Sequence, residues 1–156
     1  MSVTASQKQH TAQSVSGPTR FLATRPVWQV GALTVAAGAL VTEGFALIAR
    51  GAGVPMEAAG PGDTEAAAIP VGGFAGGVVF WSIVGIVLAV ALARWAGRPA
   101  RTFVVTTVAL TVLSLAGPAV APHTALSTQV VLAVSHVVAA AVIIPPLARR
   151  LSRRQG

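Results

Sequence analysis

The sequence contains no cysteine among its 156 residues. The absence of thiols excludes disulfides, thiol redox chemistry, thiolate metal sites and palmitoyl anchoring. Charge is also scarce, because charged residues make up 10% of the chain, whereas soluble globular proteins carry about 25%. Only 4 acidic residues accompany the 11 lysines and arginines. This composition is not that of a soluble globular protein.

Long apolar runs are abundant instead. Hydrophobic residues make up 54% of the chain, and the mean hydropathy is +0.74. The runs cover residues 27–49, 69–93, 102–120 and 127–148. Each is long enough for a helix to cross a hydrocarbon core of about 30 Å. The sequence therefore predicts an all-α integral membrane four-helix bundle, built from two antiparallel up-down hairpins, with no additional soluble domain.

The distribution of arginine predicts the topology of these helices. If the helices cross in turn, every lysine and arginine except Arg50 lies on one side of the membrane, in residues 1–26, 94–101 and 149–156. The opposite side carries Glu57, Asp63 and Glu65. Because basic loops remain in the cytoplasm, we predict an inner-membrane protein with both termini cytoplasmic. Residues 1–26 are polar and without a signal-peptide core, so they are predicted to be a disordered cytoplasmic tail. Residues 149–156 are predicted to be a basic cytoplasmic tail.

The sequence offers no pattern for catalysis or for a cofactor. The basic residues that give the net charge of +7 flank the spans. Membrane topology and attraction to anionic lipid therefore explain this charge better than nucleic-acid binding does. His10, His123 and His136 lack metal-ligand spacing, and no nucleophile elbow, P-loop or paired-acid motif is present. We therefore expect no enzyme, no metal and no cofactor. The expected partners are the lipid bilayer and either another membrane protein or further copies of the chain.

Two ionisable residues, Glu43 and His136, lie inside the predicted spans. Both are expected in the outer third of the bilayer, where Ser114 lies at a similar level. Intramembrane ionisable groups are functional candidates because a charge is costly in lipid. Three interpretations are open. In the first, Glu43 and His136 form a proton-handling or polar-ligand site with Ser114. In the second, Glu43 and His136 form a neutral interhelix hydrogen bond, and in the third, Glu43 reaches water near the headgroups.

Helix packing in lipid depends on small residues and polar contacts. Two overlapping GxxxG patterns open the second span, and their residues are Gly72, Gly73, Gly76 and Gly77. They predict either a packing face within the bundle or a homodimer face, although in a chain with 16 glycines the pattern also arises by chance. On the fourth span, one branched stripe is expected to face lipid, and it consists of Val131, Val134, Val138 and Val142.

Three short segments carry a resemblance to a known family. They are residues 101–103 (RTF), 114–118 (SLAGP) and 136–145 (HVVAAAVIIP). Over about residues 27–151 the chain resembles an actinobacterial family of uncharacterised small membrane proteins, a domain of unknown function with four predicted spans. The resemblance implies a four-helix membrane bundle and no known activity. It assigns no fixed position to Glu43.

These observations favour a structural or accessory component of the membrane. The alternative is a proton-coupled or small-solute transporter-like protein that uses Glu43 and His136. Four helices enclose little space, so this alternative would require oligomerisation.

Overall fold

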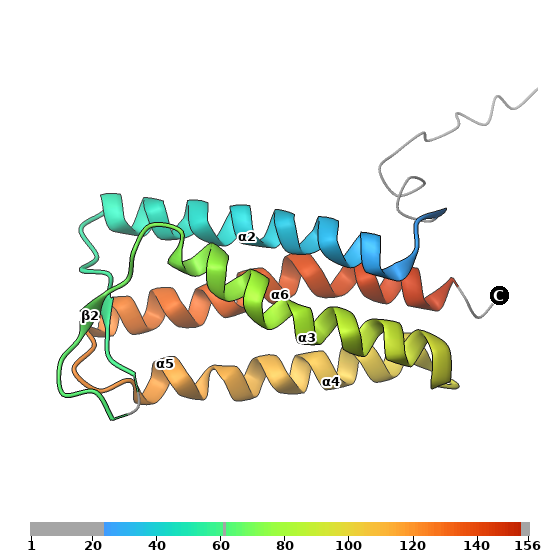
Figure 1. Ribbon diagram of the computed structural model, residues 1–156. Helices are drawn as coiled ribbons and strands as arrows, with labels where there is room; N and C mark the ends of the chain where they lie inside the picture. The colour runs from blue at the N-terminus through green and yellow to red at the C-terminus, as the bar shows by residue number, and fades with distance from the viewer. Residues whose placement is uncertain (1–23, 61, 154–156) are drawn as a thin grey trace, which may run out of the picture.

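The computed structural model describes residues 24–60 and 62–153. The described chain is mostly helical (Figure 1). Its elements are α2 (Val27–Gly51), β1 (Glu57–Ala58), β2 (Ala67–Ala68), α3 (Gly73–Trp95), α4 (Pro99–Ser114), α5 (Ala116–Val120) and α6 (Leu126–Ser152). The prediction of an all-α four-helix bundle is confirmed, with α4 and α5 together forming the third rod. Most of the predicted N-terminal tail lies outside the described residues.

The helix ends follow local backbone chemistry. Helix α3 begins at Gly73 rather than at residue 69, because Pro70 has no N–H and Gly72 adopts a φ of 89°. Helix α4 begins at Pro99, three residues earlier than expected, because proline is well suited to the first helical position. Helix α6 continues through Pro145 and Pro146 to Ser152, four residues beyond the predicted end. Prolines are tolerated in membrane-spanning helices, where neighbouring groups satisfy the freed carbonyls.

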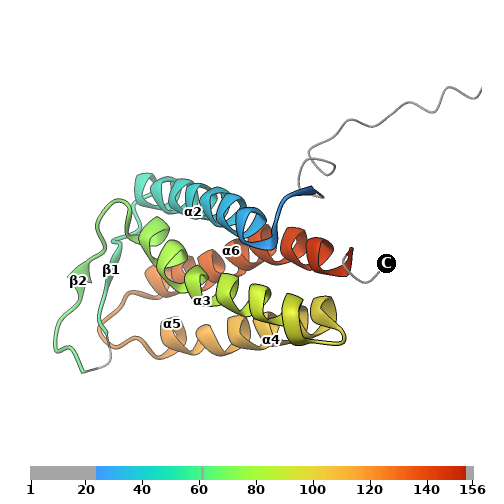
Figure 2. The ribbon, with the colours of Figure 1, turned by 45° about the vertical axis from the view of Figure 1, so that its right-hand side comes forward.

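Helix α6 is the central element of the bundle. It packs against both α2 and α4, while α3 packs mainly against α2. The helices run side by side, with the β1–β2 loop at one end and the α3–α4 connection at the other (Figures 1 and 2). The two short strands pair antiparallel, with Glu57 opposite Ala68 and Ala58 opposite Ala67. We call the end with the α3–α4 connection the arginine end and the opposite end the loop end.

The buried residues form two clusters, one near each end. The cluster at the arginine end consists of Val27, Val30, Ala89, Phe103, Leu147 and Leu151. The cluster at the loop end consists of Ala46, Ala49, Met56, Phe74 and Val131. Val131 therefore contacts α2 and does not face lipid as expected, because α6 turns that side chain toward Ala46 and Ala49.

Between the clusters, glycines of α2 bring the helices close together. A Cβ at Gly31 would lie 2.8 Å from Cγ1 of Ile86 on α3. A Cβ at Gly38 would lie 3.0 Å from Cδ1 of Ile143 on α6. Small residues at helix contacts let backbones approach in this way. The middle of the bundle is therefore packed around α2 glycines.

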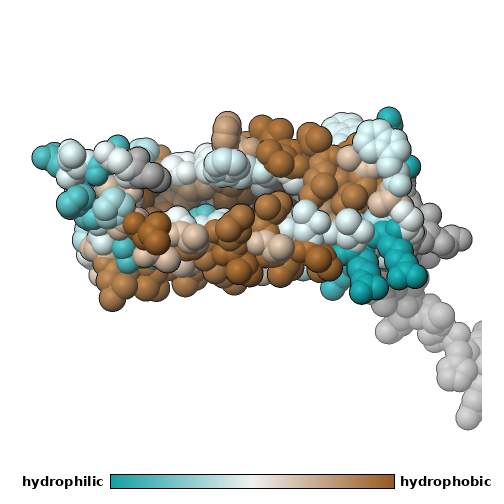
Figure 3. Space-filling model, turned by 90° about the horizontal axis from the view of Figure 1, so that it is seen from below, coloured by the Kyte–Doolittle hydropathy of each residue, from teal (hydrophilic) through white to brown (hydrophobic). Residues whose placement is uncertain are grey.

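The outer surface is apolar along the middle of the molecule. Figure 3 shows hydrophobic side chains over this region and hydrophilic ones gathered at the two ends. In the described part of the chain, four helices are long and apolar enough to cross a membrane, where α4 and α5 count as one rod, Pro99–Val120. Trp28 and Trp95 are exposed near the arginine end, and indole rings favour the membrane–water interface. The protein is a multi-pass membrane protein.

Candidate intramembrane polar site

Glu43 binds the start of helix α3. Its Oε1 accepts a hydrogen bond of 2.7 Å from the backbone N–H of Gly72, and its Oε2 accepts one of 3.1 Å from the N–H of Ala75. Helix α3 has no side-chain cap of its own, and the first amides of a helix lack partners within the helix. A carboxylate also interacts favourably with the positive end of the helix dipole. Glu43 therefore caps α3 from the neighbouring helix α2.

Arg50 lies two helical turns beyond Glu43 on the same face of α2. Its Nη2 donates a hydrogen bond of 2.7 Å to the carbonyl oxygen of Ile69. Its Nε is buried and has no hydrogen-bond partner within the described residues. Glu43 and Arg50 thus hold residues 69–75 from both sides of Pro70, and we call these two residues the α3 clamp.

His136 has a hydrogen-bond partner at one ring nitrogen, Nδ1, and none at the other among residues 24–60 and 62–153. Nδ1 lies 2.7 Å from the carbonyl oxygen of Leu132, one turn earlier on α6. Since a carbonyl oxygen only accepts, this contact assigns the proton of neutral His136 to Nδ1 and leaves a lone pair on Nε2. The ring lines a mainly apolar cavity of about 280 Å³ between β1, α5 and α6. Pro118, Pro122 and Leu132 also line this cavity.

Ser114 is the last residue of α4. Its Oγ donates a hydrogen bond of 2.7 Å to the carbonyl oxygen of Thr111, and Ser114 does not line the cavity beside His136. Within residues 24–60 and 62–153, no hydrogen bond or ion pair joins Glu43, Ser114 and His136 to one another. The structure gives each of them a backbone partner instead.

The glycines of α3 have separate roles at its start. Gly72 supplies the positive φ before the helix, and a Cβ at Gly73 would lie 2.9 Å from Cγ2 of Ile69. Nothing lies within 4 Å of a Cβ placed at Gly76 or Gly77. The GxxxG residues therefore make no close contact with another helix that the structure describes, and Gly76 and Gly77 are exposed.

Residues 22–153 match a family described only as a family of unknown function (DUF6069). The chain belongs to DUF6069. The match covers every helix described above, so membership extends to the whole bundle. No curated protein and no solved structure matches the chain. Membership in DUF6069 indicates no activity, and the candidate site must be judged on its geometry.

Sequence reasoning did not single out Arg50 or the cavity beside His136. In the topology predicted from the sequence, Arg50 is the one basic residue on the side of the acidic loop, and its spacing of seven from Glu43 places both on one face of a helix. These two features of the sequence are sufficient to predict that Arg50 lies on the same face of the first span as Glu43. The cavity has no comparable signal, because it depends on how the loop after β1 packs against α5 and α6.

Proposed function

We propose that this DUF6069 chain is a non-enzymatic structural or accessory component of the cell membrane, which acts by packing against another membrane component. The observation that supports this proposal most directly is the bonding of Glu43, whose two carboxylate oxygens both accept amides of α3. Protonation of that carboxylate would weaken the cap. A residue used in this way stabilises a helix junction and is poorly suited to carrying protons.

Other polar groups in the spans support the same interpretation. Thr34 and Thr42 of α2 donate to carbonyls of their own helix, at 3.0 Å to Val30 and 2.8 Å to Gly38. Thr107 and Thr111 of α4 do the same. These hydroxyls are satisfied locally, as is usual for threonine in helices. The exposed Gly76 and Gly77 of α3 then offer a close-packing surface that no described residue of the chain covers.

The experiment is purification of the tagged full chain from native membranes in a mild detergent, with Gly76→Leu as a matched variant. We expect the wild-type chain to purify with a discrete partner or a second copy, and the variant to lose it while keeping the same monomer stability. A wild-type chain that purifies as a lone monomer would contradict the accessory role.

A proton-coupled or small-solute transporter-like protein is the second candidate. The observation that favours it is that His136 lines a cavity and that its Nε2 has no hydrogen-bond partner in the described part of the chain. Proteoliposomes loaded with a pH-sensitive dye test this function. An accessory component predicts the same proton leak for wild type, Glu43→Gln and His136→Leu. A wild-type flux that both substitutions abolish would establish the transporter instead.

A further inference from the structure

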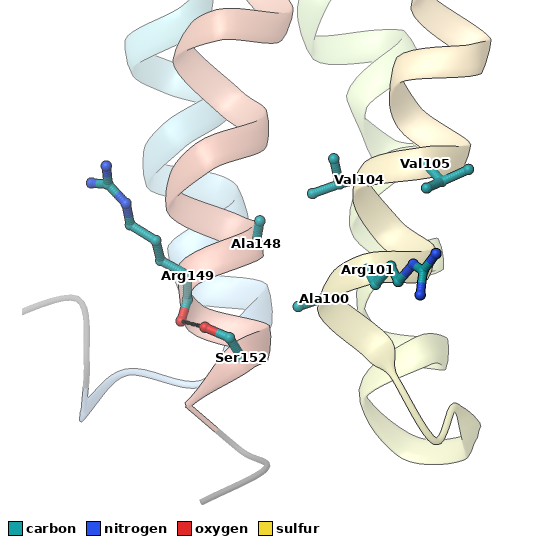
Figure 4. A pocket seen from close by; sticks show the side chains of 7 residues that line it. All are labelled: Ala100, Arg101, Val104, Val105, Ala148, Arg149 and Ser152. Atoms are coloured by element: carbon teal, nitrogen blue, oxygen red, sulfur yellow. Dashed lines mark hydrogen bonds between the residues drawn. The ribbon is translucent and has the colours of Figure 1, made fainter.

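A groove lies between the first turns of α4 and the last turns of α6, at the arginine end. Its volume is about 430 Å³. In Figure 4, Ala100, Val104 and Ala148 lie in the space between the two helices. Arg101 and Arg149 flank the groove and point away from each other, one on each helix. Val105 and Ser152 complete its lining.

The residues that line the groove change from polar to apolar along the direction that crosses the membrane. Helix α4 runs away from the arginine end, so Arg101 lies at the mouth and Val104 one turn deeper. Ser152, the last residue of α6, lies at the mouth from the other side. The exposed indoles of Trp28 and Trp95 belong to this same end and mark the headgroup level. The groove thus has a polar mouth at the headgroups and an apolar floor at the depth of acyl chains.

The charge at this mouth is uncompensated. Both Arg101 and Arg149 are exposed, and neither guanidinium has a hydrogen-bond or ion-pair partner among the described residues. By contrast, Nε of nearby Arg150 donates to the carbonyl oxygen of Arg25. The 4 acidic residues of the chain all precede α3 and belong to the part of the chain that leads to the loop end, away from the groove. They are Glu43, Glu57, Asp63 and Glu65. The positive end of the α4 dipole adds to the attraction for an anion.

We propose that this groove binds one anionic phospholipid of the surrounding leaflet. The phosphate lies at the mouth, where the two flexible arginine side chains close over it and Arg guanidinium forms paired hydrogen bonds to its oxygens. One acyl chain lies along Val104, Val105 and Ala148. Basic pockets between membrane helices bind anionic headgroups by the same chemistry. This site is independent of the accessory role proposed above.

The test is native mass spectrometry of the full chain in detergent, titrated with dioleoylphosphatidylglycerol and, separately, dioleoylphosphatidylcholine. We expect one molecule of phosphatidylglycerol to bind tightly and phosphatidylcholine to bind much more weakly. Each arginine near a lipid surface contributes about 5-fold in affinity, so Arg101→Gln with Arg149→Gln should weaken phosphatidylglycerol about 30-fold. The matched control is Arg94→Gln with Arg153→Gln, which removes the same charge at the same end outside the groove.

A second variant tests the groove itself. Val104→Trp fills the floor and leaves every charge in place, so it should also remove the bound phosphatidylglycerol. Equal loss in the control pair would overturn the proposal in favour of diffuse surface charge. Unchanged phosphatidylglycerol binding in the variant Arg101→Gln with Arg149→Gln would also overturn the proposal. Unchanged binding in Val104→Trp would overturn it as well, since the lipid would then be held without the groove. Circular dichroism of each variant confirms that its helices are intact.

Discussion

At the scale of single residues, Glu43 illustrates how an apolar bundle accommodates a carboxylate. The residue lies about 12 Å along α2 from Gly51, yet α3 begins beside it and supplies two amide donors. Charge-assisted hydrogen bonds to a helix start are among the stronger polar contacts in proteins. The carboxylate thus has backbone partners and does not need His136.

Loss of this cap should be measurable as a loss of stability. We expect Glu43→Leu to lower the free energy of unfolding by about 1–3 kcal/mol, because the Gly72 and Ala75 amides lose a charged acceptor. Glu43→Gln should cost less, since its amide oxygen can still accept one bond. Unfolding by titration of a denaturing detergent measures both. The control is Glu57→Gln, at an exposed position, and a Glu43→Leu effect no larger than this control would contradict the capping role.

The same measurement tests whether Glu43 and His136 act together. They share no hydrogen-bond partner, so the effects of Glu43→Leu and His136→Leu should add within about 0.5 kcal/mol in the double variant. A direct polar pair would behave differently, because removing both partners leaves no buried group alone. If the double variant loses clearly less stability than the sum of the two single losses, Glu43 and His136 form a direct polar pair after all.

The tautomer of His136 is a separate expectation. Because Nδ1 donates to the Leu132 carbonyl, neutral His136 should carry its proton on Nδ1. Nitrogen-15 NMR of the chain in detergent distinguishes the two ring nitrogens, and we expect the unprotonated shift at Nε2. His123, in the loop before α6, provides a reference imidazole. A spectrum of His136 with the proton on Nε2 would reject the assigned hydrogen bond.

At the scale of helices, sequence predicts which segments form spans far better than which faces meet. Long apolar runs suffice for the spans, because lipid demands a helix of that length. The faces are not marked, since a valine that contacts lipid and one that contacts a helix are equally apolar. Val131 was expected on the lipid face and lies in the core at the loop end. Glu43 was identified by its rarity, but its partners are backbone amides, which no side-chain pattern reveals.

The contrast between α2 and α3 glycines gives a packing prediction. Gly31→Leu should destabilise the isolated bundle by about 1–3 kcal/mol, because even a Cβ there would overlap Ile86. Gly76→Leu should leave the isolated bundle within about 0.5 kcal/mol, as expected for an exposed site. Detergent-titration unfolding compares the two. Similar destabilisation by both would mean that the Gly76 face is packed in the protein as isolated.

At the scale of the whole molecule, the two ends of the bundle differ in chemistry. The loop end holds the α3 clamp, the short hairpin and the hydrogen bond from Ala59 N–H to Thr124 Oγ1. The arginine end holds the exposed tryptophans, the α3–α4 connection and the groove between α4 and α6. The loop end is therefore fixed by several polar contacts within the chain, while the arginine end presents the exposed Arg101 and Arg149 to the surroundings.

This asymmetry predicts the orientation of the chain in its membrane. Reporter fusions after Gly60, in the loop end, and after Gly97, in the α3–α4 connection, should give opposite readouts, with Gly97 cytoplasmic. The reason is that short loops rich in arginine resist translocation, whereas acidic residues have little effect. Replacing Arg94, Arg98 and Arg101 with glutamine should weaken this preference, while neutralising the acids of the loop end serves as the control. The same readout at Gly60 and Gly97 would contradict the crossing of α3, and opposite readouts with Gly60 cytoplasmic would reverse the orientation alone.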